Sequence, residues 1–406
     1  MKQRRLIQAA AFALFLATCS LPWVGLWNPN GVADTGLYSL YGENLTHGLV
    51  PYRDYFMEFP PGAIPALVLP ALPGSHYVAW FHVFEFMFGA GSLVCLGAIL
   101  ARIAPKPRRW IVPLAIAAIA PAILGPITLN SFDYWPTFLM TAAVAALVYD
   151  RPRTGFALLG AATAAKLFPA ALLPVAIIFV VRRYGSRPWR GPLAAYAATV
   201  VALFLPFAVL GPGGLRFSLK TQLERGLQLE SLGASLLAAA HHLGLYRPSY
   251  TPHLAYAQLA GPLASSVATV STIAMLVAIA AVAWRYRHAD SSAEGFVYAV
   301  AVTVVATVAF AKVLSPQYLI WLIPLVAATA LRSRIAPALL LVALALTRIW
   351  VPDRFAELQS MNWVTWVLLG RNVVLVALFA TSLVLLRRID APSEPQTARQ
   401  RARRGR

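Results

Sequence analysis

The sequence predicts an all-α polytopic membrane protein with about twelve transmembrane helices. Hydrophobic residues make up 59% of the 406 residues, whereas charged residues make up only 12%. Apolar runs of about 18 residues or more recur along the chain, and a helix of that length crosses a bilayer. A soluble domain of the same size needs a much more polar surface, so the composition argues against a soluble protein.

The positive charges lie in short clusters between the apolar runs. Most of the 34 Lys and Arg residues fall in loops on one side of the predicted topology, and most of the 15 Asp and Glu residues fall on the other. Cytoplasmic loops carry such an excess of positive charge, so we expect a multi-pass plasma-membrane protein with both termini in the cytoplasm. The net charge of +19 then reflects basic cytoplasmic loops and a basic C-terminal tail that is expected to contact anionic membrane lipids, and nucleic acid is not expected as a partner.

The predicted spans follow the alternation of apolar runs and basic loops. They lie near residues 6–27, 76–101, 110–129, 135–149, 155–166, 167–181, 191–211, 262–284, 295–312, 316–331, 335–351 and 363–386. The first run is also compatible with a secretory signal, and Leu16–Cys19 resembles a lipoprotein cleavage site. Because the run is longer than the apolar region of a typical signal, we expect an uncleaved first helix.

Two apolar segments do not fit a single upright crossing. The run from Gly62 to Leu72 is short and bracketed by prolines, so it is predicted to be a re-entrant or interfacial helix. The run 155–181 has arginines beyond both of its ends. Two tilted helices that turn near Lys166 and Pro169 keep both basic ends in the cytoplasm and place Lys166 towards the external face.

These assignments give one integral membrane domain over residues 1–386 with two large external loops. The first loop covers residues 28–75, and the second covers residues 212–261. Leucines recur near helical spacing between residues 215 and 232, which predicts one amphipathic helix lying on the membrane. Residues 387–406 are rich in Arg, Pro and Gln, and they are expected to form a disordered, basic cytoplasmic tail.

The first external loop carries carboxylates beside the membrane, where charged groups are costly and usually functional. They are Asp34, Glu43, Asp54 and Glu58. Asp34 closely follows the first helix, and it is either a catalytic base or the N-cap of the next helical segment. Glu58 precedes two prolines; it either orients the loop or an acceptor, or pairs with Arg53.

Several cations lie near the external face or within apolar helices. Lys166 and Lys312 are candidates for binding a phosphate or pyrophosphate, and extension of their side chains to the membrane interface is the alternative. Arg371 lies inside an apolar helix and needs a carboxylate or a lipid phosphate as its partner.

Missing motifs exclude several classes of site. The chain has no Gly-rich phosphate loop ending in Lys-Ser or Lys-Thr, so nucleotide hydrolysis is not expected. The seven histidines show no metal-ligand spacing, and Asp34 has no second Asp two positions later, so no metal is expected. Cys19 and Cys95 lie in apolar runs, which argues against a disulfide or a thiolate metal site.

A series of short motifs occurs in a characteristic order. It consists of Asp34 in the first loop, Gly-Leu-Val-Pro-Tyr-Arg-Asp at 48–54, Glu-Phe-Pro-Pro at 58–61, Ala-Ala-Lys-Leu-Phe-Pro at 164–169, Gln222, Arg225, Gln228, Glu230 and Ser231, and Lys-Val-Leu-Ser-Pro-Gln-Tyr at 312–318. From about residue 20 to 370, this order resembles glycosyltransferase family 87, the polyprenol-phosphate-mannose-dependent α-1,2-mannosyltransferases of the GT-C membrane fold.

The resemblance implies transfer of a sugar, expected to be mannose, from a polyprenyl-phosphate donor to a hydroxyl of a cell-envelope glycolipid or polysaccharide on the outer face of the membrane. The donor is a substrate, and no cofactor is implied. Asp34 corresponds to the family's catalytic Asp and would be the base of an inverting reaction, in which the lipid phosphate leaves as an anion and needs no general acid. Transfer of arabinofuranose is one alternative, and a flippase or transporter of lipid-linked sugars is another.

The other motif residues divide into two groups under this resemblance. Lys166, Lys312 and Arg371 are expected to bind the phosphate of the donor. Positioning of the substrates or of the loop is expected from Glu58, Tyr52, Asp133, Gln222, Arg225 and Gln317. A transporter would place polar residues along several helices, whereas the acids here gather on one face, which favours an enzyme.

Overall fold

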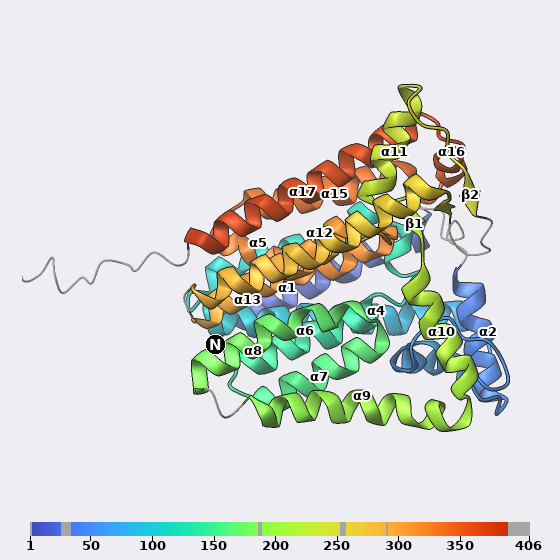
Figure 1. Cartoon of the computed structure of the whole chain (residues 1–406). Coiled ribbons are helices and arrows are strands. Elements are labelled where there is room, and N and C mark those ends of the chain that lie inside the picture. The colour runs from blue at the N-terminus through green and yellow to red at the C-terminus, as the bar shows by residue number, and fades with distance from the viewer. Residues whose placement is uncertain (1, 26–33, 186–188, 252–256, 290, 389–406) are drawn as a thin grey trace, which may run out of the picture.

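A computed structural model of the chain describes residues 2–25, 34–185, 189–251, 257–289 and 291–388. The long helices lie side by side along one common direction, and short helices and a small sheet gather at one end of the bundle (Figure 1). Long apolar sequences favour this arrangement, because a helix satisfies its own backbone hydrogen bonds. The predicted helical architecture is confirmed. The predicted tail beyond residue 388 lies outside the described residues.

Each predicted span overlaps one helix of the bundle. These helices are α1 (Lys2–Cys19), α4 (Tyr77–Ile103), α5 (Ile111–Leu124), α6 (Tyr134–Val148), α7 (Pro152–Ala165), α8 (Leu173–Tyr184), α9 (Arg190–Leu210), α12 (Pro262–Arg287), α13 (Ala293–Phe310), α14 (Ile323–Ala328), α15 (Ile335–Trp350) and α17 (Val364–Arg388). Among the described residues, 6 helices are long and apolar enough to cross a membrane. The positions of the helices are therefore confirmed, while the number of crossings stays a prediction.

Short 3₁₀ turns extend or connect these helices. They lie at Leu21–Val24, Pro61–Ala63, Leu69–Ala71, Pro107–Trp110, Pro126–Thr128, Phe168–Leu172, Pro316–Leu322 and Thr329–Leu331. The first helix ends earlier than predicted, because Pro22 enters such a turn and Gly25, with φ of 79°, closes it.

Helix α13 lies at the centre of the bundle. Its sequence has no charged residue after Glu294, and every residue from Gly295 to Ala309 is buried. Helices α12, α14 and α17 pack around it. A helix that is apolar on all sides can occupy such a central position without burying an unpaired polar side chain.

Ion pairs between the predicted cytoplasmic loops hold one end of the bundle together, which we call the basic end. Asp150 pairs with Arg102 at 3.0 Å and with Arg183 at 2.5 Å, and Glu294 pairs with Arg332 at 2.8 Å. The Asp150–Arg183 contact brings the start of α7 beside the end of α8, so the chain reverses direction between them. The predicted pair of short helices that turn near Lys166 is confirmed.

The opposite end, which we call the site end, is built mainly from the two long loops. It contains α2 (Asp34–Thr46), α3 (Ile64–Val68), α10 (Pro212–Glu224), α11 (Leu232–His242) and α16 (Phe355–Gln359). Three short strands, β1 (Leu227–Gln228), β2 (Tyr250–Thr251) and β3 (Gln258–Leu259), form an antiparallel sheet of order β1–β3–β2, with Leu227 opposite Leu259. Such short strands carry too little alternation to be predicted from the sequence.

The single amphipathic helix predicted across residues 215–232 is wrong. Helix α10 ends at Glu224, and Arg225 leaves the helical conformation with φ of −47° and ψ of 131°. Leu227 and Leu229 are buried at the sheet rather than exposed along a membrane-facing stripe. Pairing of β1 with β3 overrides the helical spacing of the leucines, because it satisfies the backbone where the helix stops.

The predicted short helix between Gly62 and Leu72 is confirmed as a helical segment around α3. It packs against α2, α4 and α7. A Cβ on Gly62 would lie 2.4 Å from the carbonyl carbon of Ala164, and Trp135 Nε1 donates to the Gly62 carbonyl at 2.8 Å. Glycine has no Cβ, so residue 62 can approach the backbone of Ala164 this closely. The first loop therefore packs directly against the end of α7, just before Lys166.

Gly214 provides a test of how the first loop contacts α10. A Cβ there would lie 1.9 Å from the Tyr52 carbonyl oxygen, whereas a Cβ on Gly213 would meet nothing within 4 Å. We expect Gly214→Ala to lower the free energy of unfolding by about 1–3 kcal/mol, as overpacking does. Gly213→Ala is the matched control and should be neutral or stabilising, because Ala favours a helix over Gly by about 1 kcal/mol. Equal melting temperatures for the two variants would contradict the close contact.

Candidate active site

A cavity of about 820 Å³ lies at the site end. Predicted site residues that line it are Asp34, Glu58, Lys166, Gln222, Arg225 and Gln317. Another part of its wall is apolar and comes from the start of α8, the turn before it, and α12, with residues such as Ala171, Pro174, Met275, Leu276 and Ile279. The cavity therefore joins a charged region to an apolar arm, which suits a ligand with a polar head and an apolar tail.

Asp34 is the first residue of α2, and its half-buried side chain lines the cavity. Tyr38 Oη lies 3.5 Å from Asp34 Oδ2 and donates a weak hydrogen bond to it. Burial raises the pKa of the Asp34 carboxyl, and the negative charge of Glu58 raises it further, while Lys166 opposes the rise. A carboxylate with a raised pKa is a better proton acceptor near neutral pH, so this environment suits a general base.

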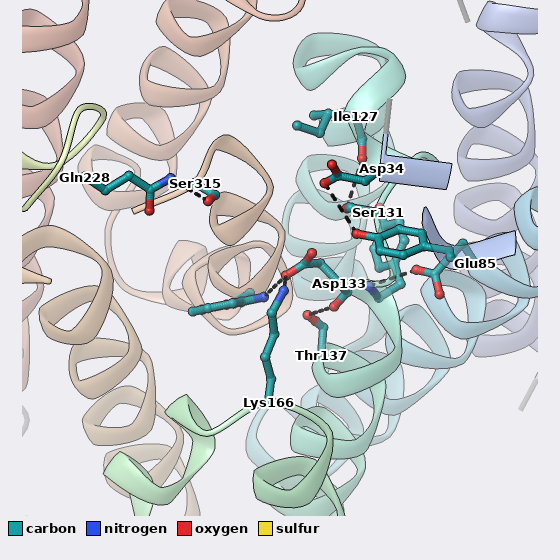
Figure 2. Close-up of polar contacts among 12 residues, drawn as sticks. Asp34, Glu85, Ile127, Ser131, Asp133, Thr137, Lys166, Gln228 and Ser315 are labelled. Atoms are coloured by element: carbon teal, nitrogen blue, oxygen red, sulfur yellow. Dashed lines mark hydrogen bonds and ion pairs between the residues drawn. The ribbon is translucent and has the colours of Figure 1, made fainter. Parts of the chain in front are cut away.

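Lys166 and Asp133, which were predicted as separate site residues, form one ion pair (Figure 2). Lys166 Nζ lies 2.6 Å from Asp133 Oδ1, and Trp321 Nε1 donates to the same oxygen at 2.6 Å. The Asp133 side chain is fully buried, whereas that of Lys166 is 15% exposed. The rings of Phe132, Tyr318 and Trp321 lie 4.6, 5.1 and 5.3 Å from the ammonium. Asp133 and these rings hold the ammonium in place at the cavity.

The local sequence explains how Lys166 leaves its helix. Helix α7 ends at Ala165, and Lys166 is extended with φ of −154° and ψ of 132°. Pro169 follows in a 3₁₀ turn, where its missing N–H prevents continuation of the helix. The chain therefore turns with the Lys166 side chain at the cavity.

Glu58 pairs with Arg225, so the predicted alternative of a Glu58–Arg53 pair is wrong. Arg225 Nη2 donates to Glu58 Oε1 at 2.7 Å, whereas Arg53 pairs with its neighbour Asp54 at 2.8 Å. Gln222 Nε2 donates to the Glu58 carbonyl at 3.0 Å. Glu58 and Arg225 lie 167 residues apart, and their contact joins the two loops that were predicted to be external.

The segment after β1 supplies a further part of the wall. Gln228 Nε2 donates to Ser315 Oγ at 3.0 Å (Figure 2), and Gln228, Glu230 and Ser315 all line the cavity. Burial raises the pKa of the Glu230 carboxyl to about 7, against the opposing effects of its own backbone N–H and the charge of Arg371. This wall therefore presents amide, hydroxyl and carboxyl groups to a ligand.

Lys312, Arg371 and Tyr52 are not among the described residues that line the cavity. Lys312 Nζ donates to the Leu223 carbonyl at 3.1 Å, near the end of α10. Arg371 is buried and donates to the Glu230 carbonyl at 2.8 Å, and Tyr52 Oη donates to the Phe59 carbonyl. In this conformation the three side chains support the cavity wall, and their contact with substrate stays a prediction.

The structure also places the thiols and the possible metal ligands. Cys19 is buried and Cys95 is half-buried, and both are free thiols. Within the part of the chain that the structure describes, no three His, Cys, Asp or Glu side chains gather as metal ligands. The independence of the site from metal stays a prediction.

The model of a family described as glycosyltransferase family 87 matches residues 56–316, which is more than half of the chain. The chain belongs to glycosyltransferase family 87. A comparison with curated proteins found no match. The matched region of this glycosyltransferase contains the Glu58–Arg225 and Asp133–Lys166 pairs, whereas Asp34 precedes it.

Sequence reasoning missed the aromatic stack of this glycosyltransferase. The Phe168 and Trp321 rings are stacked with their centroids 3.6 Å apart, and Tyr318 stacks on Trp321 at 4.1 Å. Two of the three residues lie in the motifs around Lys166 and Lys312, so the motifs contained a signal. Aromatic residues near helix ends are common in membrane proteins, so these residues alone did not indicate a stack.

Proposed function

We propose that the protein is an inverting glycosyltransferase of the GT-C type. It moves a sugar, expected to be mannose, from a polyprenyl-phosphate donor to a hydroxyl of a cell-envelope glycolipid or polysaccharide. The observation that carries this proposal is the cavity in which Asp34 and Lys166 meet an apolar arm. The donor is itself an activated substrate, so the reaction needs no cofactor.

The apolar arm supports a lipid-linked donor. Its lining residues include Pro174 on α8 and Met275, Leu276 and Ile279 on α12. Leu276 is 57% exposed on the surface of the bundle, where a membrane protein contacts acyl chains. An isoprenoid chain in this arm would remain in apolar surroundings while its phosphate reaches the region of Lys166.

The proposed reaction assigns one role to each charged group. Asp34 accepts the proton of the acceptor hydroxyl as that oxygen forms a bond to the anomeric carbon of the donor. The bond from the anomeric carbon to the phosphate oxygen breaks on the opposite face, so the configuration inverts. Polyprenyl phosphate leaves with the bonding electron pair, and Lys166, which Asp133 holds in place, stabilises the anion.

The two ends of the bundle support the proposed orientation. The arginines that pair with Asp150 and Glu294 gather at the basic end, and cytoplasmic loops are enriched in such residues. The site end then faces outwards, with the reaction on the outer face of the plasma membrane and both termini in the cytoplasm.

Transfer by purified protein in lipid nanodiscs tests the proposal. We expect transfer from polyprenyl-phosphate mannose to an envelope glycolipid, followed by mass spectrometry, and none from a soluble nucleotide-linked mannose. Shortening the isoprenoid chain to two units should lower kcat/KM by about tenfold or more, because each buried methylene contributes about 0.8 kcal/mol. Polyprenyl-phosphate arabinofuranose, as a second donor, tests the alternative sugar. Equal use of the nucleotide-linked sugar, or no effect of chain length, would contradict a lipid-linked donor.

A further inference from the structure

We propose that Gln228 and Glu230 form a sugar-hydroxyl subsite, in which the Gln228 amide oxygen and the Glu230 carboxylate accept hydrogen bonds from hydroxyl groups of one sugar. This inference rests on the proposed function. It adds two residues that bind substrate and that select it by its hydroxyl pattern.

Both side chains have a buried oxygen that lacks a partner. Gln228 Oε1 and Glu230 Oε2 form no hydrogen bond with any described residue. Gln228 is 2% exposed and Glu230 is 3% exposed, and both line the cavity. Buried polar atoms are nearly always hydrogen-bonded, so these two oxygens are expected to receive donors from a molecule in the cavity.

Several other polar atoms of these residues are already held. Gln228 N–H donates to the Lys312 carbonyl at 3.0 Å, and Gln228 Nε2 donates to Ser315 Oγ at 3.0 Å. The Glu230 carbonyl accepts a hydrogen bond from Arg371 Nη2 at 2.8 Å. These contacts fix the position of the segment, so the two free oxygens form a preorganised pair of acceptors.

The two oxygens, on Gln228 and Glu230, indicate which chemical group the subsite binds. Both accept hydrogen bonds, and the Glu230 carboxyl repels an anion whenever it is ionised, so the site disfavours the phosphate of the donor. Sugar hydroxyls are neutral donors that match these acceptors. Figure 2 draws Gln228 to the left of the Asp133–Lys166 pair and Asp34 above the pair. The subsite suits hydroxyls of either the transferred sugar or the acceptor sugar.

Steady-state kinetics with Glu230→Gln test the subsite. This change keeps the shape of the side chain, and we expect kcat/KM for one of the two substrates to fall about tenfold to a hundredfold, as for a lost hydrogen bond to a charged group. Glu224→Gln is the matched control, because Glu224 lies in the same loop with its side chain 65% exposed, and it should behave as wild type. Gln228→Met, which removes the amide but keeps a similar volume, tests the subsite independently.

Deoxy analogues distinguish the two sugars. Removing the hydroxyl that contacts Glu230 should lower the activity of the wild-type protein by the same factor as Glu230→Gln, and it should lower the activity of that variant little further. Sensitivity in the donor series assigns the subsite to the transferred sugar, and sensitivity in the acceptor series assigns it to the acceptor.

Two outcomes would overturn the inference. The first is wild-type kinetics in both Glu230→Gln and Gln228→Met, in which case ordered solvent satisfies the two oxygens. If the wild-type protein transfers no sugar, the proposed function is wrong, but the subsite can still be tested by measuring the binding of lipids. A sugar-bearing donor or acceptor lipid should then raise the melting temperature more than polyprenyl phosphate does, and Glu230→Gln should abolish that difference. The second overturning outcome is an equal rise with all three lipids.

Discussion

Asp34→Asn is expected to reduce sugar transfer by about 10²–10⁴-fold, which is the contribution of a general base. Asn keeps the size of the side chain but cannot accept the proton of the acceptor hydroxyl. Donor binding should survive, because the ammonium of Lys166 and the apolar arm are unchanged. Transfer of a radiolabelled sugar measures the first effect, and the rise in melting temperature with added donor measures the second.

Asp54→Asn is the matched control for this prediction. Asp54 lies in the same loop, where it accepts a hydrogen bond from Val50 N–H at 2.7 Å and pairs with Arg53. This variant should transfer sugar at the wild-type rate. If Asp34→Asn also does so, Asp34 acts only as a cap of α2, and Glu58 or Asp133 becomes the candidate base. Both are less suited to that role, since each carboxylate is already bound by a cation.

The dependence of sugar transfer on pH is a second test of Asp34 as the general base. Asp34 acts as a base only when it is deprotonated, so transfer should fall as the pH falls through its pKa. Burial raises that pKa above the ordinary carboxyl value of 3.8, which places the loss of activity at a higher pH than for an exposed Asp. A profile that stays level down to the ordinary carboxyl range would show that this group is not the base.

Lys166→Met alone is expected to lower the free energy of unfolding by about 3–5 kcal/mol, the cost of removing one partner of a buried ion pair. Asp133 is fully buried and lies 2.6 Å from Lys166 Nζ, so the substitution leaves its charge without a counter-ion. Thermal unfolding in detergent measures the effect. Loss of transfer in this variant alone is therefore no evidence that Lys166 binds the donor phosphate.

The double variant Lys166→Met with Asp133→Asn separates stability from binding. It removes both charges, so most of the lost stability should return. If Lys166 also binds the phosphate, kcat/KM for the donor should remain about tenfold to a hundredfold below wild type. Lys220→Met is the control, because Lys220 and Glu224 are 62% and 65% exposed, and such surface pairs contribute only about 0–1 kcal/mol. Equal stability of the single and double variants would contradict the buried pair.

Local sequence was sufficient to locate the helices. A membrane helix needs a long apolar run, and its ends are marked by charge or proline, so each bundle helix overlaps a predicted span. The same reasoning predicted the turn at Lys166, because arginines beyond both ends of 155–181 require the chain to return to one side. It also placed Asp34 and Glu58 in the first loop, where carboxylates beside a membrane indicate a site.

Only the tertiary structure decided which side chains meet. Local spacing offered Arg53 as one possible partner for Glu58, but the partner is Arg225, 167 residues away. The leucine spacing in the second loop predicted one helix, but pairing of β1 with β3 divides it. Gln228 and Glu230 were motif residues without a role until the fold brought them to the cavity. Periodicity identifies which face of a segment is apolar, whereas hydrogen bonds and ion pairs depend on distances of a few ångströms between segments far apart in the chain.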